Sequence, residues 1–178
     1  VPDADDMEMP QTPHRGAAHL VALVPSDVTA GQTVSRHVLV SYTEGFAIEY
    51  LNRKLRPYWQ RDGQSTEAML AVAEQQYESL KQRGSQYDRE LESDLERIGG
   101  KGYAQLALLA YRQTLAAHKL VADVDGTPLM FSKENFSNGC IATVDVLYPA
   151  APFFLLLNPR LLEAQMKPIL DYAVLPRW

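Results

Sequence analysis

The sequence has a single cysteine, no long apolar run and no excess of basic charge. One cysteine, Cys140, excludes an intramolecular disulfide framework and a cysteine-based zinc cluster. No stretch reaches the roughly 18 consecutive apolar residues that a membrane-spanning helix needs. The formal net charge is -5, and basic residues are scattered among acidic ones. This pattern argues against a nucleic-acid-binding scaffold, which normally carries a basic patch.

Motifs for cofactors and metals are also missing. The chain contains no GxGxxG, no Walker sequence and no S-x-x-K, and its four histidines lack HExxH spacing. Asp123 and Asp125 precede Gly126 like half of a calcium loop, but the other oxygen ligands are absent, so we expect a plain turn. We expect His118 to be a hydrogen-bonded structural residue. The sequence therefore gives no support for a cofactor or a resident metal.

The first third of the chain has the pattern of β-structure. Two sets of residues alternate, a mainly apolar set of Val34, Arg36, Val38, Val40 and Tyr42 and a mainly polar set of Ser35, His37, Leu39 and Ser41. A Thr-Glu-Gly turn follows at 43–45. The pattern predicts a hairpin over about 33–52, which must pack on another element because an isolated hairpin is only marginally stable. Three residues at every second position are expected on the packed face: Phe46, Ile48 and Tyr50.

From Gly63 onward the spacing becomes helical. Ser65 or Thr66 is a candidate cap for a first helix, Gly84 is expected to interrupt it, and Gly99-Gly100 to end a second one. The segment 103–121 is apolar nearly all round and predicts a buried central helix.

The last part of the chain mixes short apolar runs with a helical pattern. Segments 129–132 and 141–146 resemble strands, and Asn158-Pro159 is typical of a helix start. Pro168 is expected to bend that final helix. Its predicted apolar face consists of Leu162, Met166, Ile169, Leu170 and Ala173. The fold class predicted from these patterns is α+β, with β-structure followed by a mainly helical part.

Segment 131–140 is the richest in reactive side chains, and it is either a polar structural loop or the wall of a pocket. Glu134 and Asp145 are the candidate catalytic carboxylates. Four nearby polar residues are candidates for binding a substrate: Lys133, Asn135, Ser137 and Asn138. Glu134 either forms an ion pair with Lys133 or Arg112, or faces a cleft where it acts as an acid. The lone Cys140 is expected to be a small buried hydrophobe.

Several motifs recur in order, and on them the chain resembles the glutaminase A family from about residue 20 onward. They are the run Arg-Pro-Tyr-Trp-Gln-Arg-Asp-Gly at 56–63, Tyr-Arg-Gln at 111–113, Ala-His-Lys at 117–119, the segment 131–140, Thr-Val-Asp at 143–145, and Tyr-Pro-Ala-Ala-Pro-Phe-Phe at 148–154.

The resemblance implies a fold and a domain division. Members of the family have a β-sandwich region followed by a helical domain similar to the six-hairpin (α/α) toroid of glycosidases. By this comparison, residues 1–18 are a linker or frayed tail, 19–60 the C-terminal strands of the sandwich, and 61–178 the N-terminal part of the toroid. The chain is then a fragment, and we expect it to be inactive by itself because the toroid's pocket is incomplete.

The resemblance also implies an activity, the hydrolysis of L-glutamine to L-glutamate and ammonia, in a secreted or periplasmic protein whose signal peptide is not in this segment. The site residues are inferred from this sequence alone. The expected partners are a small-molecule substrate, glutamine or a glycan, and the remainder of the polypeptide, with neither nucleic acid nor membrane. Two other classes stay open: a carbohydrate-active enzyme with two carboxylates, and a non-catalytic structural module.

Overall fold

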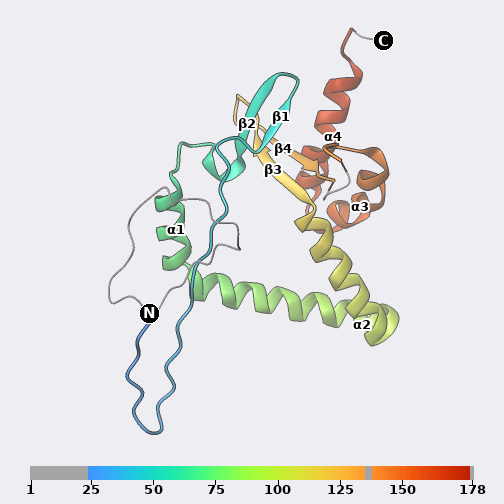
Figure 1. Ribbon diagram of the computed structural model, residues 1–178. Coiled ribbons are helices and arrows are strands. Elements are labelled where there is room, and N and C mark those ends of the chain that lie inside the picture. The colour runs from blue at the N-terminus through green and yellow to red at the C-terminus, as the bar shows by residue number, and fades with distance from the viewer. Residues whose placement is uncertain (1–23, 135–137, 177–178) are drawn as a thin grey trace. The chain divides into compact units, whose positions relative to one another are not determined.

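A computed structural model describes residues 24–134 and 138–176 (Figure 1). The chain divides into two units, residues 1–38 and 39–178, and each is considered by itself. In the first unit, the described residues 24–38 contain a turn at Ala30-Gly31 and no strand. The strand predicted between Val34 and Tyr42 is therefore wrong. Alternation of side chains did not suffice to form a strand, because no described segment pairs with residues 34–42. Val40, for example, is 90% exposed.

The second unit contains a small antiparallel sheet with the strand order β1-β2-β3-β4. Its strands are β1 (Ile48–Tyr50), β2 (Arg53–Pro57), β3 (His118–Ala122) and β4 (Pro128–Ser132). The hairpin lies later in the chain than predicted, because β1 pairs with β2 and not with a preceding strand. Its two-residue turn, Leu51-Asn52, has positive φ at both positions, which is the geometry of a type I′ turn.

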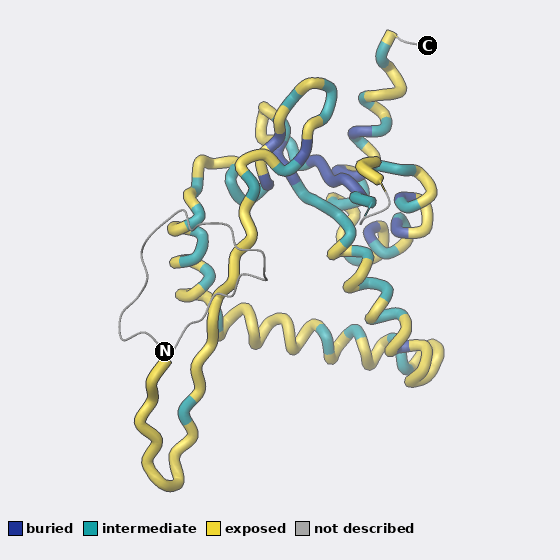
Figure 2. Tube along the Cα trace, in the orientation of Figure 1, coloured by how far each residue is buried: buried dark blue, intermediate teal, exposed yellow. Residues whose placement is uncertain are grey.

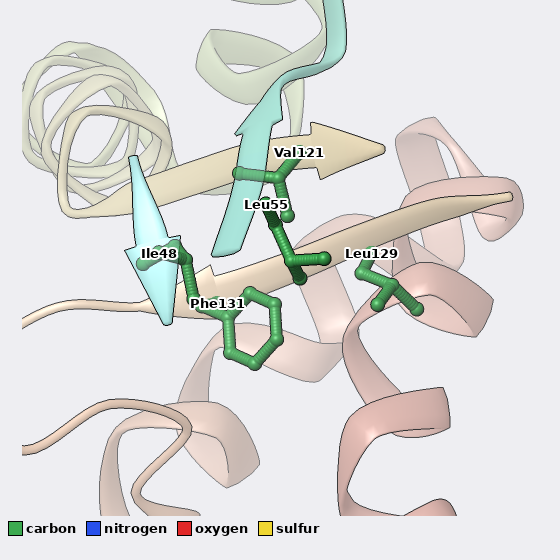
Figure 3. Close-up of a cluster of buried hydrophobic side chains, with 5 residues drawn as sticks. All are labelled: Ile48, Leu55, Val121, Leu129 and Phe131. Atoms are coloured by element: carbon green, nitrogen blue, oxygen red, sulfur yellow. The ribbon is translucent and has the colours of Figure 1, made fainter. Parts of the chain in front are cut away.

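The pairing of β3 with β4 places alternate side chains on opposite faces of the sheet. One face carries a buried cluster, drawn in Figure 3, of Ile48, Leu55, Val121, Leu129 and Phe131. The other face carries Met130, which packs against Ala150, Phe154 and Ala164. Each large side chain buried in this way contributes roughly 1.5–3 kcal/mol to folding. The predicted packed face of the hairpin is only partly correct, because Ile48 is buried but Phe46 is half exposed.

The helices α1 (Thr66–Gln75) and α2 (Tyr77–Ala116) connect β2 to β3. Ser65 is confirmed as the cap of α1, since its Oγ accepts a hydrogen bond of 3.1 Å from the backbone N–H of Ala68. The break between the helices falls at Gln76, so the predicted interruption at Gly84 is wrong. The helix continues through the exposed Gly84, because one glycine costs a helix only about 1 kcal/mol relative to alanine.

The long helix α2 bends sharply at Gly100, where the backbone has φ 78° and ψ 176°. This confirms the expected end of a helical segment at this glycine. The two halves contact each other on either side of the bend. Tyr87 Oη lies 3.4 Å from Tyr111 Oη, and Arg112 donates to Asp88 over 2.5 Å. The contacts make α2 a helical hairpin with its vertex at Gly100.

The predicted buried central helix over 103–121 is wrong in two respects. The helix ends at Ala116, and the remainder forms β3. Most residues of α2 after Gly100 are exposed (Figure 2), and Ala104 is the one residue of α2 that is buried. The cause of the change to a strand lies downstream: Asp125-Gly126 joins two apolar runs, which is a strong hairpin signal. The turn itself is confirmed, with Asp125 Oδ1 accepting from Thr127 N over 2.9 Å.

The chain closes with α3 (Val144–Leu157) and α4 (Pro159–Ala173), which pack on each other and, through α4, on β4 (Figure 1). The predicted strand over 141–146 is wrong, since only Ile141 forms a bridge and Val144 already starts α3. The helix start at Pro159 is confirmed. The predicted apolar face of α4 is only partly correct, because Leu162 packs against the buried cluster but Met166 and Leu170 are exposed. The buried residues of α4 are Ala164, Gln165 and Pro168, and the polar Gln165 is bonded to His118 of β3.

The α+β class is confirmed by this arrangement. Among the described residues, no helix is both long enough and apolar enough to cross a membrane.

The bend in α2 gives a stability prediction. Replacing Gly100 with alanine puts a Cβ on a backbone conformation that L-residues rarely adopt, and we expect a loss of about 1–3 kcal/mol in the free energy of unfolding. The matched control is Gly84→Ala, which lies in open space within the same helix and should stabilise it by up to about 1 kcal/mol. Denaturant unfolding measures both. Equal effects of the two substitutions would contradict a bend fixed by Gly100.

Candidate functional site

The candidate site begins at a loop closed by backbone pairing. Lys133 and Ile141 form an antiparallel bridge directly after β4. Glu134 N donates to the carbonyl of Cys140 over 3.2 Å, and Lys133 N donates to the carbonyl of Ala117 over 2.9 Å. These bonds hold Lys133 and Glu134, both half-buried, at the base of the loop.

Of the other substrate-binding candidates, Asn138 lies within the described residues. Asn138 is exposed, and its Oδ1 accepts a hydrogen bond of 2.8 Å from the backbone N–H of Cys140. Asn135 and Ser137 lie outside the described residues. Cys140 is exposed, so the expectation that it is buried is wrong. Cys140 lies in the polar loop, one residue before the bridge at Ile141.

The second carboxylate candidate, Asp145, lies in the first turn of α3 and lines an open groove of about 510 Å³. A carboxylate in that turn also interacts favourably with the helix dipole. The groove runs between the end of α2 and the start of α3. Its lining is Ala110, Gln113, Thr114, Ala117, His118, Asp145, Val146, Pro149, Ala150 and Phe153.

The two carboxylates do not line the same cavity. Asp145 lines the groove, whereas Glu134 is not among its lining residues. Arg112, one of the two cations suggested as partners for Glu134, forms an ion pair with Asp88. The groove therefore brings Asp145 together with His118, not with Glu134.

His118 is the titratable residue whose surroundings are most completely defined in the groove. Its Nδ1 lies 2.5 Å from the carbonyl oxygen of Thr114, and its Nε2 lies 2.8 Å from Nε2 of Gln165. Because a carbonyl only accepts, Nδ1 carries the proton, and Nε2 accepts from the Gln165 amide. Burial lowers the pKa of His118 below its ordinary value of 6.5, and the bond to Thr114 partly opposes this. The prediction that His118 is a hydrogen-bonded structural residue is thus confirmed.

Two buried polar residues beside His118 were not predicted. Ser132 and Gln165 are 1% and 0% exposed. Ser132 lies directly opposite His118 in the register of β3 and β4. This is not a hydrolytic Ser–His pair, because Nε2 of His118 is engaged by Gln165 and the serine is closed to substrate. For Ser132, the sequence feature that could have indicated a buried polar residue is its place after three apolar residues. No such feature marks Gln165.

An aromatic stack borders the groove. Phe153 of α3 stacks on Tyr111 of α2, with ring centroids 6.0 Å apart. Burial, together with the hydrogen bond to Tyr87, raises the pKa of Tyr111 to about 12, so its hydroxyl stays protonated. Within the described part of the chain, no three side chains of histidine, cysteine, aspartate or glutamate are grouped to hold a metal ion.

The lowered pKa of His118 predicts a pH-dependent stability. The unfolded chain binds a proton near pH 6.5 and the folded chain only at lower pH, so folding stability falls as the pH drops below 6.5. His118→Gln keeps an acceptor for Gln165 and removes the titration. We expect the melting temperature of the variant to fall less than that of the parent when the pH is lowered from about 7 to about 5.

The control for this experiment is His37→Gln, an exposed histidine of the first unit. Thermal unfolding of the three proteins at both pH values measures the effect. If His118→Gln retains the parent's full pH dependence, the assignment of a neutral His118 is incorrect.

Two protein families match the chain. Residues 8–94 match a domain of unknown function (DUF5127), and residues 100–178 match the glutaminase A six helical-hairpin domain. The boundary between the matches falls beside Gly100, where α2 bends. No solved structure matches the chain.

Two fungal proteins are similar to this chain. One is a probable glutaminase of Arthroderma benhamiae, 26% identical over 139 residues, which are 76% of this chain. The other is glutaminase A of Aspergillus oryzae, 33% identical over 113 residues, which are 64% of this chain. The chain spans only 16% of the length of either relative. The match of residues 100–178 and these relatives confirm the resemblance of the chain to the glutaminase A family.

Proposed function

We propose that this chain is part of an amidohydrolase that converts L-glutamine to L-glutamate and ammonia. The observation that carries the proposal is the match of residues 100–178 to the glutaminase A six helical-hairpin domain. The names of both fungal relatives agree with it.

The reaction requires a group at the scissile amide that can both accept and donate a proton. Water adds to the carboxamide carbon, the C–N bond breaks, and the nitrogen leaves as ammonia after gaining a proton. We assign the acid–base step to Glu134 and, from the separate groove that it lines, a longer-range electrostatic role to Asp145. The position of Glu134 supports this order, because it lies half-buried at the base of the loop, next to Lys133, which is proposed to bind substrate.

Substrate binding is assigned to the polar loop. The ammonium group of Lys133 suits the α-carboxylate of glutamine, and carboxamides suit its amide. The residues proposed for these contacts are Lys133, Asn135, Ser137 and Asn138. A secreted or periplasmic location completes the proposal, with a small molecule as substrate and neither nucleic acid nor membrane as partner. The net charge of -5 and the absence of a basic patch in the sequence support the last point.

The test is Glu134→Gln in the complete protein that carries this chain. The substitution keeps the shape of the side chain and removes its ionisation. We expect kcat for glutamine to fall by about 10²-fold or more, with an unchanged melting temperature. Asp145→Asn should reduce kcat without abolishing it. Steady-state release of ammonia measures both effects.

The matched control is Glu163→Gln, an exposed carboxylate of α4 outside the groove, which should leave kcat unchanged. A lower melting temperature with nearly intact kcat in Glu134→Gln would make Glu134 a structural residue. Turnover of aryl glycosides, with none of glutamine, would replace the proposed activity by a carbohydrate-active one.

A further inference from the structure

Two fully buried polar atoms lie on the face of the sheet that α4 covers. Ser132 Oγ and Gln165 Oε1 have no hydrogen-bond partner among the described residues. Their side chains are 1% and 0% exposed, so bulk water does not reach them. A buried hydroxyl or carboxamide oxygen without a partner is costly, and native proteins seldom contain one.

The two atoms belong to residues that share a neighbour. Ser132 and His118 are direct partners in the antiparallel register of β4 and β3, so their side chains point to the same face. Gln165 reaches the same imidazole from α4, with its amide nitrogen 2.8 Å from Nε2. His118, Ser132 and Gln165 thus form one polar cluster inside an otherwise apolar layer, next to Met130 and Phe154.

We infer that Ser132 and Gln165 bind one internal water molecule between them, behind His118. The water donates a hydrogen bond to Gln165 Oε1 and exchanges a second one with Ser132 Oγ. A buried water needs two to four polar partners, and these two atoms supply the minimum.

The chemistry of the cluster selects a neutral ligand. His118 offers no lone pair, because its Nε2 already accepts from Gln165 and its Nδ1 faces Thr114. A cation in this place would have only one amide oxygen and one hydroxyl to replace its hydration shell, and an anion would have a single hydroxyl donor. Neither an anion nor a cation would have its charge compensated there, whereas a water molecule can form hydrogen bonds with both atoms.

The bound water also fixes the orientation of Gln165. With Oε1 turned to the water, the amide NH₂ must point at Nε2 of His118, which holds the imidazole in its Nδ1–H form. Gln165 and the water therefore keep His118 in its neutral form, although Gln165 is not among the residues that line the groove. Gln165 acts as a positioning residue for His118.

The sign of one substitution tests the inference. If Ser132 holds the water, Ser132→Ala removes a partner and lowers the hydrogen-exchange protection of the β3–β4 amides in the intact protein, by about tenfold. If the hydroxyl is unpartnered, alanine removes a cost and the protection rises. Unchanged or increased protection overturns the inference. Ser93→Ala, an exposed serine of α2, is the control and should leave the β3–β4 amides unchanged.

A double-mutant cycle then tests the sharing. Gln165→Met removes the amide, and its separate effect on His118 cancels in the cycle because it is present with and without Ser132. A shared water predicts that the double variant loses several-fold less protection than the product of the two single losses. Additive effects overturn the shared site. A crystal structure of the intact protein decides between a bridging water and a direct Ser132–Gln165 bond, and the latter also overturns the inference.

Discussion

Both hydrophobic clusters depend on the pairing of β3 with β4. The five paired positions from His118–Ser132 to Ala122–Pro128 fix which residues enter which face. Shifting the register by one residue would turn Phe131 away from Ile48 and Leu55, and Met130 away from Phe154. One strand pair thus holds the hairpin of β1 and β2 on one face and the helices α3 and α4 on the other.

Polar contacts at the edges of the sheet reinforce this pairing. Arg53 of β2 donates to both carboxylate oxygens of Asp123, at 2.7 and 2.8 Å, where the β3–β4 turn begins. The Tyr50 hydroxyl donates to the carbonyl of Pro168 in α4. Because the Asp123 side chain is only 8% exposed, removing Arg53 would leave a nearly buried charge without its partner. The contacts therefore fix the position of the hairpin more than they add stability of their own.

The sequence predicted what depends on short-range chemistry and missed what depends on a partner strand. The Ser65 cap, the bend at Gly100, the Asp125-Gly126 turn and the helix start at Pro159 each follow from the conformational preference of one or two residues. The region between Val34 and Tyr42 has a strand pattern, but a strand also needs a neighbour to pair with. The mistake over 103–121 had the opposite cause, because β4, further along the chain, turned the end of an apolar helical segment into a strand.

The candidate site was predictable as a segment and not as a geometry. Polar residues between apolar runs marked the loop after β4 correctly, but sequence spacing did not show that Asp145 faces a groove shared with His118. Gln165 was hidden because a single glutamine in an amphipathic helix normally lies on the solvated side. Its burial became visible only when α4 was placed against the sheet.

The hairpin of α2 has a consequence for how its length can vary. Its two cross-contacts, Tyr87–Tyr111 and Asp88–Arg112, each join residues 24 positions apart across the bend at Gly100. Inserting one residue between either contact and the bend would rotate the rest of that arm by about 100° about its axis. Tyrosine would then no longer face tyrosine, nor arginine aspartate. Because each added residue also moves the contact about 1.5 Å along the arm, both contacts survive only when the two arms gain the same whole number of helical turns.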